Sequence, residues 1–373
     1  MNIYWYWPFL RREEMVLADG LLRPGDRLVV QTTPRPSDPI VSHDPAREIR
    51  ATLPGVRDRA EGSAAWLLSR GSTYIRRARA RRRALRDESF GVAHIVYLNP
   101  FTDALDLASL QRHVPIVSTV HDVVPHHSRV PDAVERRLLR SQYRYAGTIL
   151  VHHDSVRRRL LAEFPIDPSR VVMIPLPISE VSRPAPDSAS EGPPTVLFFG
   201  TFRRNKGVDV LLQAIAALTG EVEARFVFAG RGFADVEQLV CDAADRDPRI
   251  VTEIGFATAQ RKHELYAAAD LIVLPYTTFA SQSAVLQDAY AHGVPLVVSD
   301  VGALGETVRD DKTGWVVTPG DPDALAATLL AALRDPAARV TASEAAAAVA
   351  ATRTPRIIGT RLRALYDRVA DSP

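Results

Sequence analysis

The residues best suited to chemistry in this sequence are the cations in the run FFGTFRRNKG at positions 198–207. An apolar strand is expected to end at Gly200, and a helix is expected to begin at Val208. Arg203 and Lys206 would then lie beside a helix N-terminus, where free N–H groups and the helix dipole attract anions. A guanidinium can bind two phosphate oxygens, and an ammonium supplies a point charge. The run predicts a phosphate site rather than a solvated basic loop, since the chain has only three lysines.

A second helix start that could bind an anion follows the apolar run DLIVLPY at 270–276. A polar turn leads from there to a helix expected between Ser283 and Gly293, and Ser281 or Ser283 would cap it. Asp288 lies about one turn inside this helix, where its carboxylate could accept hydrogen bonds from the hydroxyls of a ribose. A solvent-facing helix residue is the competing interpretation of Asp288.

A histidine and an aspartate, His121 and Asp122, follow the apolar run at 117–120. At the carboxyl end of a strand His121 could serve a site, or it could be a polar residue satisfied within the core. Histidine pairs also occur at 126–127 and 152–153, but adjacent residues do not share a helix face, and no Cys, Asp or Glu accompanies them at ligand spacing. No metal site is therefore predicted, and the sequence has no P-loop, nucleophile elbow or cysteine pair.

These residues need strands that end at one edge of a sheet, and the sequence alternates strands with helices in both halves. The expected strands are 3–7, 27–32, 93–98, 116–120, 148–152, 171–175, 195–199, 224–229, 250–253, 271–275, 295–299 and 315–317. The expected helices are 13–22, 133–145, 154–164 with Asp154 as its cap, 208–218, 235–244, 263–268, 284–292 and 323–333. This alternation predicts an α/β fold with two doubly wound parallel sheets.

The chain is expected to form two domains and a closing helix. Residues 1–180 make the first domain, 181–194 a linker rich in Pro and Ser, and 195–352 the second domain. Two such domains are expected to face a cleft with the carboxyl ends of their sheets. The last segment, 353–373, has apolar residues at helical spacing, namely Ile358, Leu362, Leu365 and Val369. Whether this helix returns to the first domain stays open.

Composition excludes several classes of protein. With 373 residues, 46% of them hydrophobic, the chain can build two or three cores, so it is neither a disordered tail nor a low-complexity scaffold. A single cysteine, Cys241, indicates a reducing compartment. No apolar run reaches the ~18 residues of a membrane span, and the start, MNIYWYWP, reads as a strand rather than a signal peptide. A cytoplasmic location is expected.

Positive charge is concentrated in the first half of the chain. Through Glu180 there are 27 Lys and Arg against 20 Asp and Glu, and the rest has 19 against 24. Seven arginines lie between Arg76 and Arg86, which is typical of a basic amphipathic helix at a membrane surface or beside an anionic acceptor. A solvated helix in an arginine-rich chain is the competing interpretation. Nucleic acid is not an expected partner, because the run has no interleaved aromatic residues.

Together these motifs resemble the retaining sugar-nucleotide glycosyltransferases of family 4, which have the GT-B fold. The second domain of that family often reads F-G-x-I-R-x-Y-K-G, D-x-x-V-L-P-Y, Q-S-G-V-L, A-x-A-x-G-x-P-V-V, G-G-x-x-E and T-G-x-x-V. The corresponding segments here are 199–207, 270–276, 282–286, 289–297, 302–306 and 313–317. The match is close over 196–333 and weak in the first half, where TVHD at 119–122 is similar to a T-x-H-D strand end.

The resemblance implies a role for each matching residue. Arg203 and Lys206 match the cations that bind the donor diphosphate and stabilise its departure. His121 matches a histidine that contacts the donor sugar, and Asp288 matches a glutamate that binds ribose. The other implied donor contacts are Gly200, Gly255, Phe256, Gln282, Ser283, Ala284 and Val285, and the acceptor-side residues are Phe9, Arg11 and Asp122. No metal or cofactor is implied, because the nucleotide sugar is itself a substrate.

Three positions depart from the family pattern. The first glutamate of the family's E-x7-E pair aligns with Ala280, the G-R pair reads Gly200-Thr201, and WPFLR at 7–11 replaces a G-G turn. The expected function is transfer of a sugar from a nucleoside-diphosphate sugar to an acceptor hydroxyl with retention of configuration. Two alternatives stay open: a sugar-nucleotide epimerase of the same fold, and a non-catalytic sugar-nucleotide-binding protein, which the missing glutamate would suit.

Overall fold

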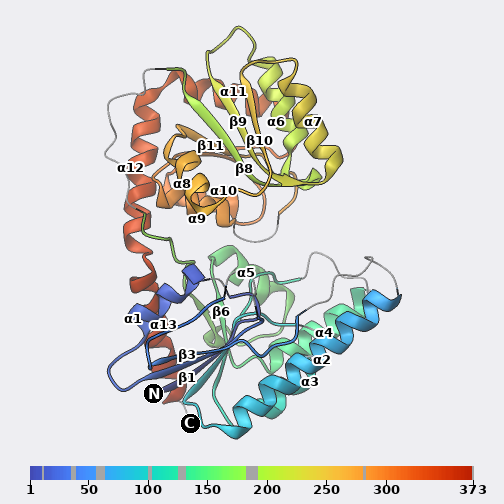
Figure 1. Ribbon diagram of the computed structural model, residues 1–373, viewed down its shortest axis with the longest axis vertical. Helices are drawn as coiled ribbons and strands as arrows, with labels where there is room; N and C mark the ends of the chain where they lie inside the picture. The colour runs from blue at the N-terminus through green and yellow to red at the C-terminus, as the bar shows by residue number, and fades with distance from the viewer. Residues whose placement is uncertain are drawn as a thin grey trace. The chain divides into compact units, whose positions relative to one another are not determined.

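The computed structural model describes residues 1–10, 12–34, 39–55, 64–99, 103–124, 132–181, 192–279 and 283–371. It forms two compact units, Met1–Pro175 with Pro355–Pro373, and Leu176–Thr354 (Figure 1). The chain therefore leaves the first unit before the segment 181–194 that the sequence predicts as a linker. Most of that segment lies outside the described residues.

The first unit is built on a parallel sheet of seven strands in the order β3-β2-β1-β4-β5-β6-β7. The strands are β1 Asn2–Tyr6, β2 Arg27–Gln31, β3 Arg47–Arg50, β4 Val92–Ile95, β5 Ile116–Thr119, β6 Thr148–Val151 and β7 Val171–Met173. The central strands are buried on both faces, as a parallel sheet covered by helices requires. The sequence does not predict β3, because its residues, REIR, are mostly charged and half-buried.

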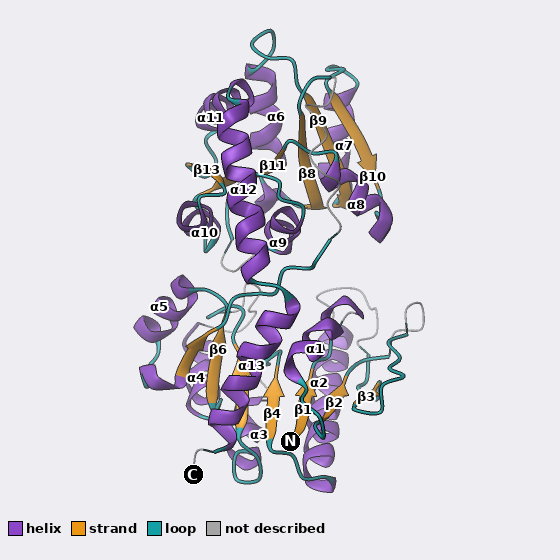
Figure 2. Cartoon of the chain, turned by 90° about the vertical axis from the view of Figure 1, so that its left-hand side faces the viewer, coloured by secondary structure: helices purple, strands orange, loops and turns teal. Residues whose placement is uncertain are grey.

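Helices cover both faces of this sheet (Figure 2). They are α1 Leu17–Leu21 after the 3-10 helix η1 Arg12–Val16, α2 Ala64–Asp87, α3 Asp103–Leu110, α4 Asp132–Arg144, α5 Asp154–Glu163 and α13 Pro355–Ala370, with the 3-10 helix η2 Pro168–Arg170 before β7. Tyr4 and Tyr6 of β1 pack with α2 and α3. Ile3 and Trp5 pack with α1 and α13, because successive residues of a strand point to opposite faces.

One sequence prediction about a helix end needs correction. His153, and not Asp154, caps α5: its backbone is extended, and its Nδ1 accepts the N–H of Ser155 at 3.1 Å. The closing helix expected at 353–373 is α13, which is separate from the preceding helix α12, Pro336–Thr352, because Pro355 cannot continue that helix.

Helix α13 belongs to the first unit, which settles the question that the sequence left open. It packs closely on α1 through two glycines: a Cβ on Gly20 would lie 1.9 Å from the carbonyl oxygen of Arg356, and one on Gly359 would lie 2.3 Å from that of Leu17. The indole N–H of Trp5 donates to the hydroxyl of Tyr366 over 2.9 Å. The first unit therefore contains both ends of the chain.

The second unit is a parallel sheet of six strands in the order β10-β9-β8-β11-β12-β13. The strands are β8 Thr195–Phe202, β9 Arg225–Gly232, β10 Ile250–Ile254, β11 Leu271–Leu274, β12 Leu296–Ser299 and β13 Gly314–Val317. Its helices are α6 Val208–Ala217, α7 Ala234–Ala244, α8 Ala259–Ala267, α9 Ala284–Ala291, α10 Leu304–Asp311, α11 Pro322–Arg334 and α12. Helices α6, α7 and α11 share one core with the sheet, and α8, α9, α10 and α12 share the other.

Strand β8 does not end at Gly200, as the sequence predicts, but runs to Phe202 and pairs with β9 along its whole length. Glycine at this position instead allows the backbones of β8 and β9 to lie very close together. Gly200 pairs with Gly230, and a Cβ on Gly230 would lie 1.8 Å from the carbonyl oxygen of Gly200. Both glycines have positive φ, 129° and 141°, a conformation that other residues rarely adopt.

Candidate functional site

A pocket of about 200 Å³ lies in the second unit where β8 and β11 end and α9 begins. Five residues that the sequence predicts as site residues line it: Gly200, Lys206, Ser283, Ala284 and Val285. The pocket also contains aromatic rings that the sequence analysis did not single out, those of Phe198, Phe199, Tyr276 and Phe279. The carboxyl ends of β8 and β11 meet here because these strands are neighbours in the sheet.

Lys206 reaches the pocket from the 3-10 helix η3, Arg204–Lys206. Its Nζ lies 3.6 Å from the ring centroid of Tyr276 and 4.5 Å from that of Phe279. Burial, with a smaller contribution from the nearby charge of Arg203, lowers the pKa of Lys206 to about 8. The ammonium is therefore partly dehydrated, so an anion that enters the pocket meets a cation with few waters to displace.

The other two cations of the basic run differ in their surroundings. Arg204 forms an ion pair with Asp235, with 2.6 Å between nitrogen and oxygen. Arg203 is exposed and forms no ion pair with any described residue. Of the two, Arg203 is the one whose guanidinium is free to bind a ligand.

The start of α9 supplies the second half of the pocket. Ser283 is the N-cap residue, and its side chain makes no capping hydrogen bond. Its hydroxyl instead lies 3.4 Å from that of Tyr276. The first N–H groups of a helix have no partner within the helix, so those at the start of α9 can donate to an anion. Gln282 and Ser281 lie outside the described residues.

Asp288 is not among the residues that line the pocket. Its Oδ1 accepts a hydrogen bond from Nζ of Lys262 on α8 over 2.9 Å, and both side chains are half-buried. The backbone carbonyl of Asp288 also accepts the Nδ1–H of His292 over 2.8 Å. Nothing in the local sequence around Asp288 indicates that Lys262, 26 residues earlier and one of only three lysines, is its partner.

The residues predicted to lie near the donor base follow β10. Gly255 has φ 145° and donates its N–H to the carbonyl of Gly230 over 2.8 Å. Phe256 is 84% exposed, and the guanidinium of Arg231 lies 5.7 Å from its ring centroid. The structure thus presents an exposed aromatic face beside a cation, but neither Gly255 nor Phe256 lines the pocket.

In the first unit, His121 follows β5 and is held by its neighbours on both sides. Its Nε2 lies 3.0 Å from the carbonyl oxygen of Val96, its ring stacks on Tyr97 at 4.6 Å and 26°, and the ring of His152 lies 5.3 Å away. A carbonyl can only accept, so Nε2 carries the proton. Burial lowers the pKa of His121 and favours the neutral ring. The remaining nitrogen, Nδ1, is then a hydrogen-bond acceptor.

Three histidines, His94, His121 and His152, lie close together in the first unit because β4, β5 and β6 are adjacent strands of its sheet. Burial lowers the pKa of both His94 and His152 to about 3, so both rings are neutral at pH 7. His94 contacts the hydroxyls of Thr119 and Tyr366. In the described part of the chain no group of three or more His, Cys, Asp or Glu side chains could hold a metal ion. Sequence spacing alone could not find this cluster, because it depends on strand order.

Of the predicted acceptor-side residues, Phe9 contacts this cluster through Tyr97. It is 48% exposed, its ring meets that of Tyr97 edge-on at 5.2 Å, and the guanidinium of Arg77 lies 5.6 Å from its centroid. Asp122 is half-buried beside His121. Arg11 lies outside the described residues.

The arginine run lies on α2 but does not form one solvent-facing surface. Arg77 and Arg81 are buried, at 3% and 0% exposure. Arg81 pairs with the buried Asp106 over 2.5 Å, and Arg77 donates to the carbonyl of Pro54 over 2.9 Å. The prediction that the whole run faces a membrane or solvent is therefore wrong for these two residues, because α3 and the Pro54 loop supply partners for them. Arg76, Arg79, Arg83 and Arg86 are exposed.

Among the described helices, none combines the length and the apolar character of a membrane span.

Two family models match the chain. "Glycosyltransferase Family 4" matches residues 15–180, and "Glycosyl transferases group 1" matches residues 193–335. Over 352 residues the chain is 27% identical to the alpha-D-kanosaminyltransferase of Streptomyces kanamyceticus, covering 89% of this chain and 87% of that one. It is 33% identical over 223 residues to the D-inositol 3-phosphate glycosyltransferase of Mycobacterium avium, covering 56% of this chain and about half, 51%, of that one.

Solved structures share the fold. The sucrose-phosphate synthase of Thermosynechococcus elongatus superposes with a TM-score of 0.76 at 19% identity, over 99% of each chain. Anabaena HepE in complex with UDP-glucose superposes with a TM-score of 0.67 at 15% identity, over 99% of each chain. Together with the family models these likenesses confirm the predicted GT-B fold of two Rossmann-like domains.

Proposed function

Since this chain is a glycosyltransferase with the GT-B fold, we propose that it transfers a sugar from a nucleoside-diphosphate sugar to an acceptor hydroxyl with retention of configuration. The observation that carries the proposal is the pocket in which the Lys206 ammonium and the start of α9 lie together. A cation and free N–H groups suit a diphosphate. The UDP-glucose bound to HepE supports this choice of donor.

In the proposed reaction, the bond between the anomeric carbon and the diphosphate oxygen breaks, and the acceptor oxygen bonds to that carbon from the same face. The acceptor proton passes to the departing phosphate oxygen, so that no separate base is required. Lys206, Arg203 and the N–H groups of α9 stabilise the charge that grows on the leaving group. His121 accepts a hydrogen bond from a hydroxyl of the donor sugar, and Asp288 binds the ribose.

The test measures nucleotide binding first and turnover second. UDP, GDP, ADP and dTDP are compared in a thermal-shift assay, because a ligand at a hundred times its Kd stabilises the fold by about 2.7 kcal/mol. The nucleotide that raises the Tm is then supplied as its sugar diphosphates, and release of the free diphosphate is measured with candidate acceptors. An epimerase would isomerise the donor with no acceptor present. A non-catalytic protein would show the Tm shift without turnover.

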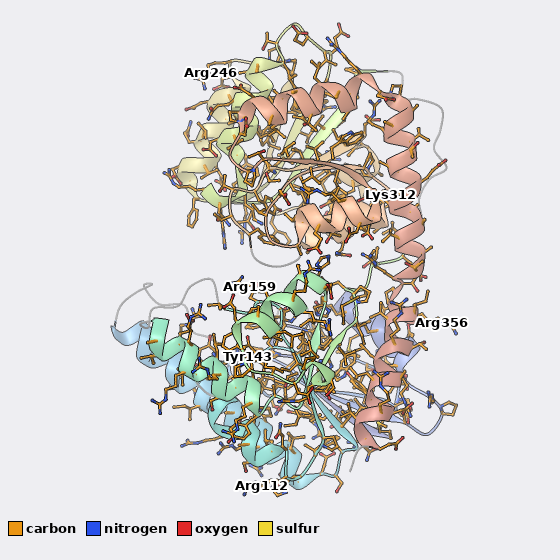
Figure 3. All side chains as sticks on the ribbon, turned by 180° about the vertical axis from the view of Figure 1, so that it is seen from behind. Arg112, Tyr143, Arg159, Arg246, Lys312 and Arg356 are labelled. Atoms are coloured by element: carbon orange, nitrogen blue, oxygen red, sulfur yellow. The ribbon has the colours of Figure 1, made fainter. Side chains whose placement is uncertain are left out.

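Contact with an anionic membrane surface is the second part of the proposal. Helices α2, α3 and α4 lie side by side over one face of the first sheet (Figure 1). Exposed arginines on α2 and α4, together with Arg112 after α3 (Figure 3), form what we call the basic face. The exposed arginines of this basic face are Arg76, Arg79, Arg83, Arg86, Arg112, Arg136, Arg137, Arg140 and Arg144. Two exposed aliphatic residues, Ile75 and Val134, lie among them.

Ion pairing distinguishes arginines that are available to bind a ligand from arginines that are merely frequent in this arginine-rich chain. Arg83 pairs with Asp87, and Arg136 pairs with Glu163. The other seven form no ion pair with a residue that the structure describes. Elsewhere on the same unit Arg27, Arg47 and Arg50 are each paired with acidic side chains. A cytoplasmic location agrees with this proposal, because the acidic lipids of a cell face that compartment.

Vesicle sedimentation tests the basic face. The quadruple variant Arg76→Gln, Arg79→Gln, Arg83→Gln and Arg86→Gln should bind acidic vesicles at least roughly tenfold more weakly at low salt, because each cation near such a surface contributes about 1 kcal/mol. The control removes the same charge from exposed arginines elsewhere, through Arg225→Gln, Arg246→Gln, Arg356→Gln and Arg361→Gln. Equal binding by both variants, or binding that neutral vesicles match, would contradict a membrane contact.

A further inference from the structure

The ammonium of Lys206 is enclosed by two aromatic rings. Nζ lies 3.6 Å from the centroid of Tyr276 and 4.5 Å from that of Phe279, and these two rings meet at 68° with 5.2 Å between centroids. Tyr276 is 2% exposed and directly follows β11 and Pro275, so its ring has a fixed position. A cation over an aromatic face is held by the quadrupole of the ring, most strongly where water is excluded.

The loop that carries Lys206 is fastened to the loop that carries Tyr276. The N–H of Thr277 donates to the carbonyl of Asn205 over 3.1 Å, and the side-chain amide of Asn205 donates to the carbonyl of Thr278 over 3.3 Å. Gly207 has φ 65°, and a Cβ there would lie 1.8 Å from the carbonyl oxygen of Pro275. The two loops therefore behave as one rigid support, although about 70 residues separate them in sequence.

Tyr276 also contacts the start of α9. Its hydroxyl lies 3.4 Å from Oγ of Ser283, the N-cap residue whose side chain makes no capping hydrogen bond. Burial raises the pKa of Tyr276 to about 12, so its hydroxyl keeps its proton at neutral pH. One side chain thus contacts both halves of the pocket, the cation through its ring face and the helix start through its hydroxyl.

We propose that Tyr276 is a positioning residue of the donor site, which holds the Lys206 ammonium and the Ser283 hydroxyl so that both face one phosphate group. This inference rests on the proposed function, because the phosphate is that of the donor. Tyr276 itself does not bind the phosphate. The ring is the essential part, and the hydroxyl has the smaller role, since its contact with Ser283 is long.

The scarcity of lysine permits a direct test that needs no substrate. Reductive methylation with ¹³C-formaldehyde labels Lys206, Lys262, Lys312 and the N-terminal amine, and Lys262→Arg and Lys312→Arg assign the signals. Lys312 is exposed after α10 and serves as the reference for an unshielded lysine (Figure 3). The Lys206 methyl signal should lie upfield of that reference, because it lies over ring faces.

Tyr276→Phe and Tyr276→Leu form a matched pair for this measurement. Phenylalanine keeps the ring and loses the hydroxyl, so the upfield shift should remain. Leucine fills similar space without a ring, so most of the upfield shift should disappear. The titration midpoint of Lys206 should also fall below about 8, because the ammonium stays dehydrated but loses the attraction of the ring. If Tyr276→Leu does not fold, Phe279→Leu removes the second ring and should reduce the shift by a smaller amount.

Donor kinetics complete the test. Tyr276→Leu should lower kcat/KM for the donor at least roughly tenfold, mainly through kcat, whereas Tyr276→Phe should change it by less than roughly threefold. Equal losses in the two variants, or an unshifted Lys206 signal in the native protein, would overturn the inference. A shifted Lys206 signal in a protein that turns over no nucleotide sugar would instead overturn the proposed function and leave the ring contact standing.

Discussion

The Nε2–H of His121 donates a hydrogen bond to the carbonyl oxygen of Val96 over 3.0 Å, and this contact fixes the role of the other ring nitrogen. Because burial lowers the pKa of His121, the ring is neutral at pH 7, and its Nδ1 accepts. The histidine that the sequence assigns to the donor sugar is therefore set up to receive a hydrogen bond from a hydroxyl rather than to donate one.

Asparagine and glutamine substitutions of His121 test the roles of its two ring nitrogens separately. In His121→Asn the amide oxygen reaches the position of Nδ1, whereas in His121→Gln the amide reaches that of Nε2. The asparagine variant should keep kcat/KM for the donor within roughly tenfold of the native value. The glutamine and alanine variants should both lose more of kcat/KM for the donor. A hydrogen bond to the substrate contributes about 1 kcal/mol, and a donor-sugar hydroxyl left without a partner costs more than that. Steady-state kinetics would contradict this if glutamine were the better substitute.

Lys206 should determine the alkaline limit of activity. Only the ammonium form attracts a diphosphate, and its pKa is lowered to about 8, so kcat/KM should fall as the pH rises through about 8. Lys206→Ala and Arg203→Ala should each lower kcat/KM by roughly a hundredfold, or about 3 kcal/mol, mainly in kcat. Arg204→Ala is the matched control, since Asp235 already neutralises that cation. Near-native turnover in Lys206→Ala would remove this residue from the mechanism.

Asp288 should recognise ribose and little else. Asp288→Ala should weaken binding of the cognate nucleoside diphosphate at least roughly tenfold, because hydrogen bonds to a carboxylate contribute about 1.5–3 kcal/mol. The same variant should bind the 2′,3′-dideoxynucleotide as the native protein does. Lys262→Ala keeps the carboxylate and removes its partner, so its effect should be smaller. Calorimetric titration measures all of these affinities, and an equal loss for both nucleotides would give Asp288 a purely structural role.

The pair of Arg81 and Asp106 should matter for stability and not for donor binding. Both side chains are fully buried, and Arg81→Ala leaves Asp106 with the partly exposed Arg82, 3.4 Å away, as an ion-pair partner, so the free energy of unfolding should fall by about 3 kcal/mol. Arg79→Ala, on the exposed side of the same helix, should change it by less than about 0.5 kcal/mol. Urea denaturation distinguishes the two. An unchanged midpoint for Arg81→Ala would mean that water reaches Asp106.

The pocket lined by Lys206 and Ser283 could be predicted because its parts are local. Lys206 and Ser283 each follow an apolar strand within a few residues, and the carboxyl ends of parallel strands share one edge of a sheet. Helix and strand positions followed from apolar periodicity in the same way. The exceptions include α3, which no predicted helix covers, and β3 and α10, whose charged residues mask the pattern.

The remaining features depend on contacts that spacing does not reveal. Tyr97, His94 and His152 join His121 only because β4, β5 and β6 are neighbours in the sheet. Arg81 looks like a surface residue until α3 supplies Asp106. The glycine of the basic run suggested the end of a strand, but it serves the close approach of β8 and β9.

The return of α13 has a consequence for the order in which a ribosome could complete this fold. The indole of Trp5 donates a hydrogen bond to Tyr366, which lies 361 residues further along the chain. The apolar face made by Ile3, Trp5 and α1 packs against α13, so it stays exposed until α13 has been synthesised. The second unit, residues 176–354, has all its strands and helices before α13 emerges. It can therefore fold during synthesis, whereas the first unit, which begins first, can only finish after α13 has been added.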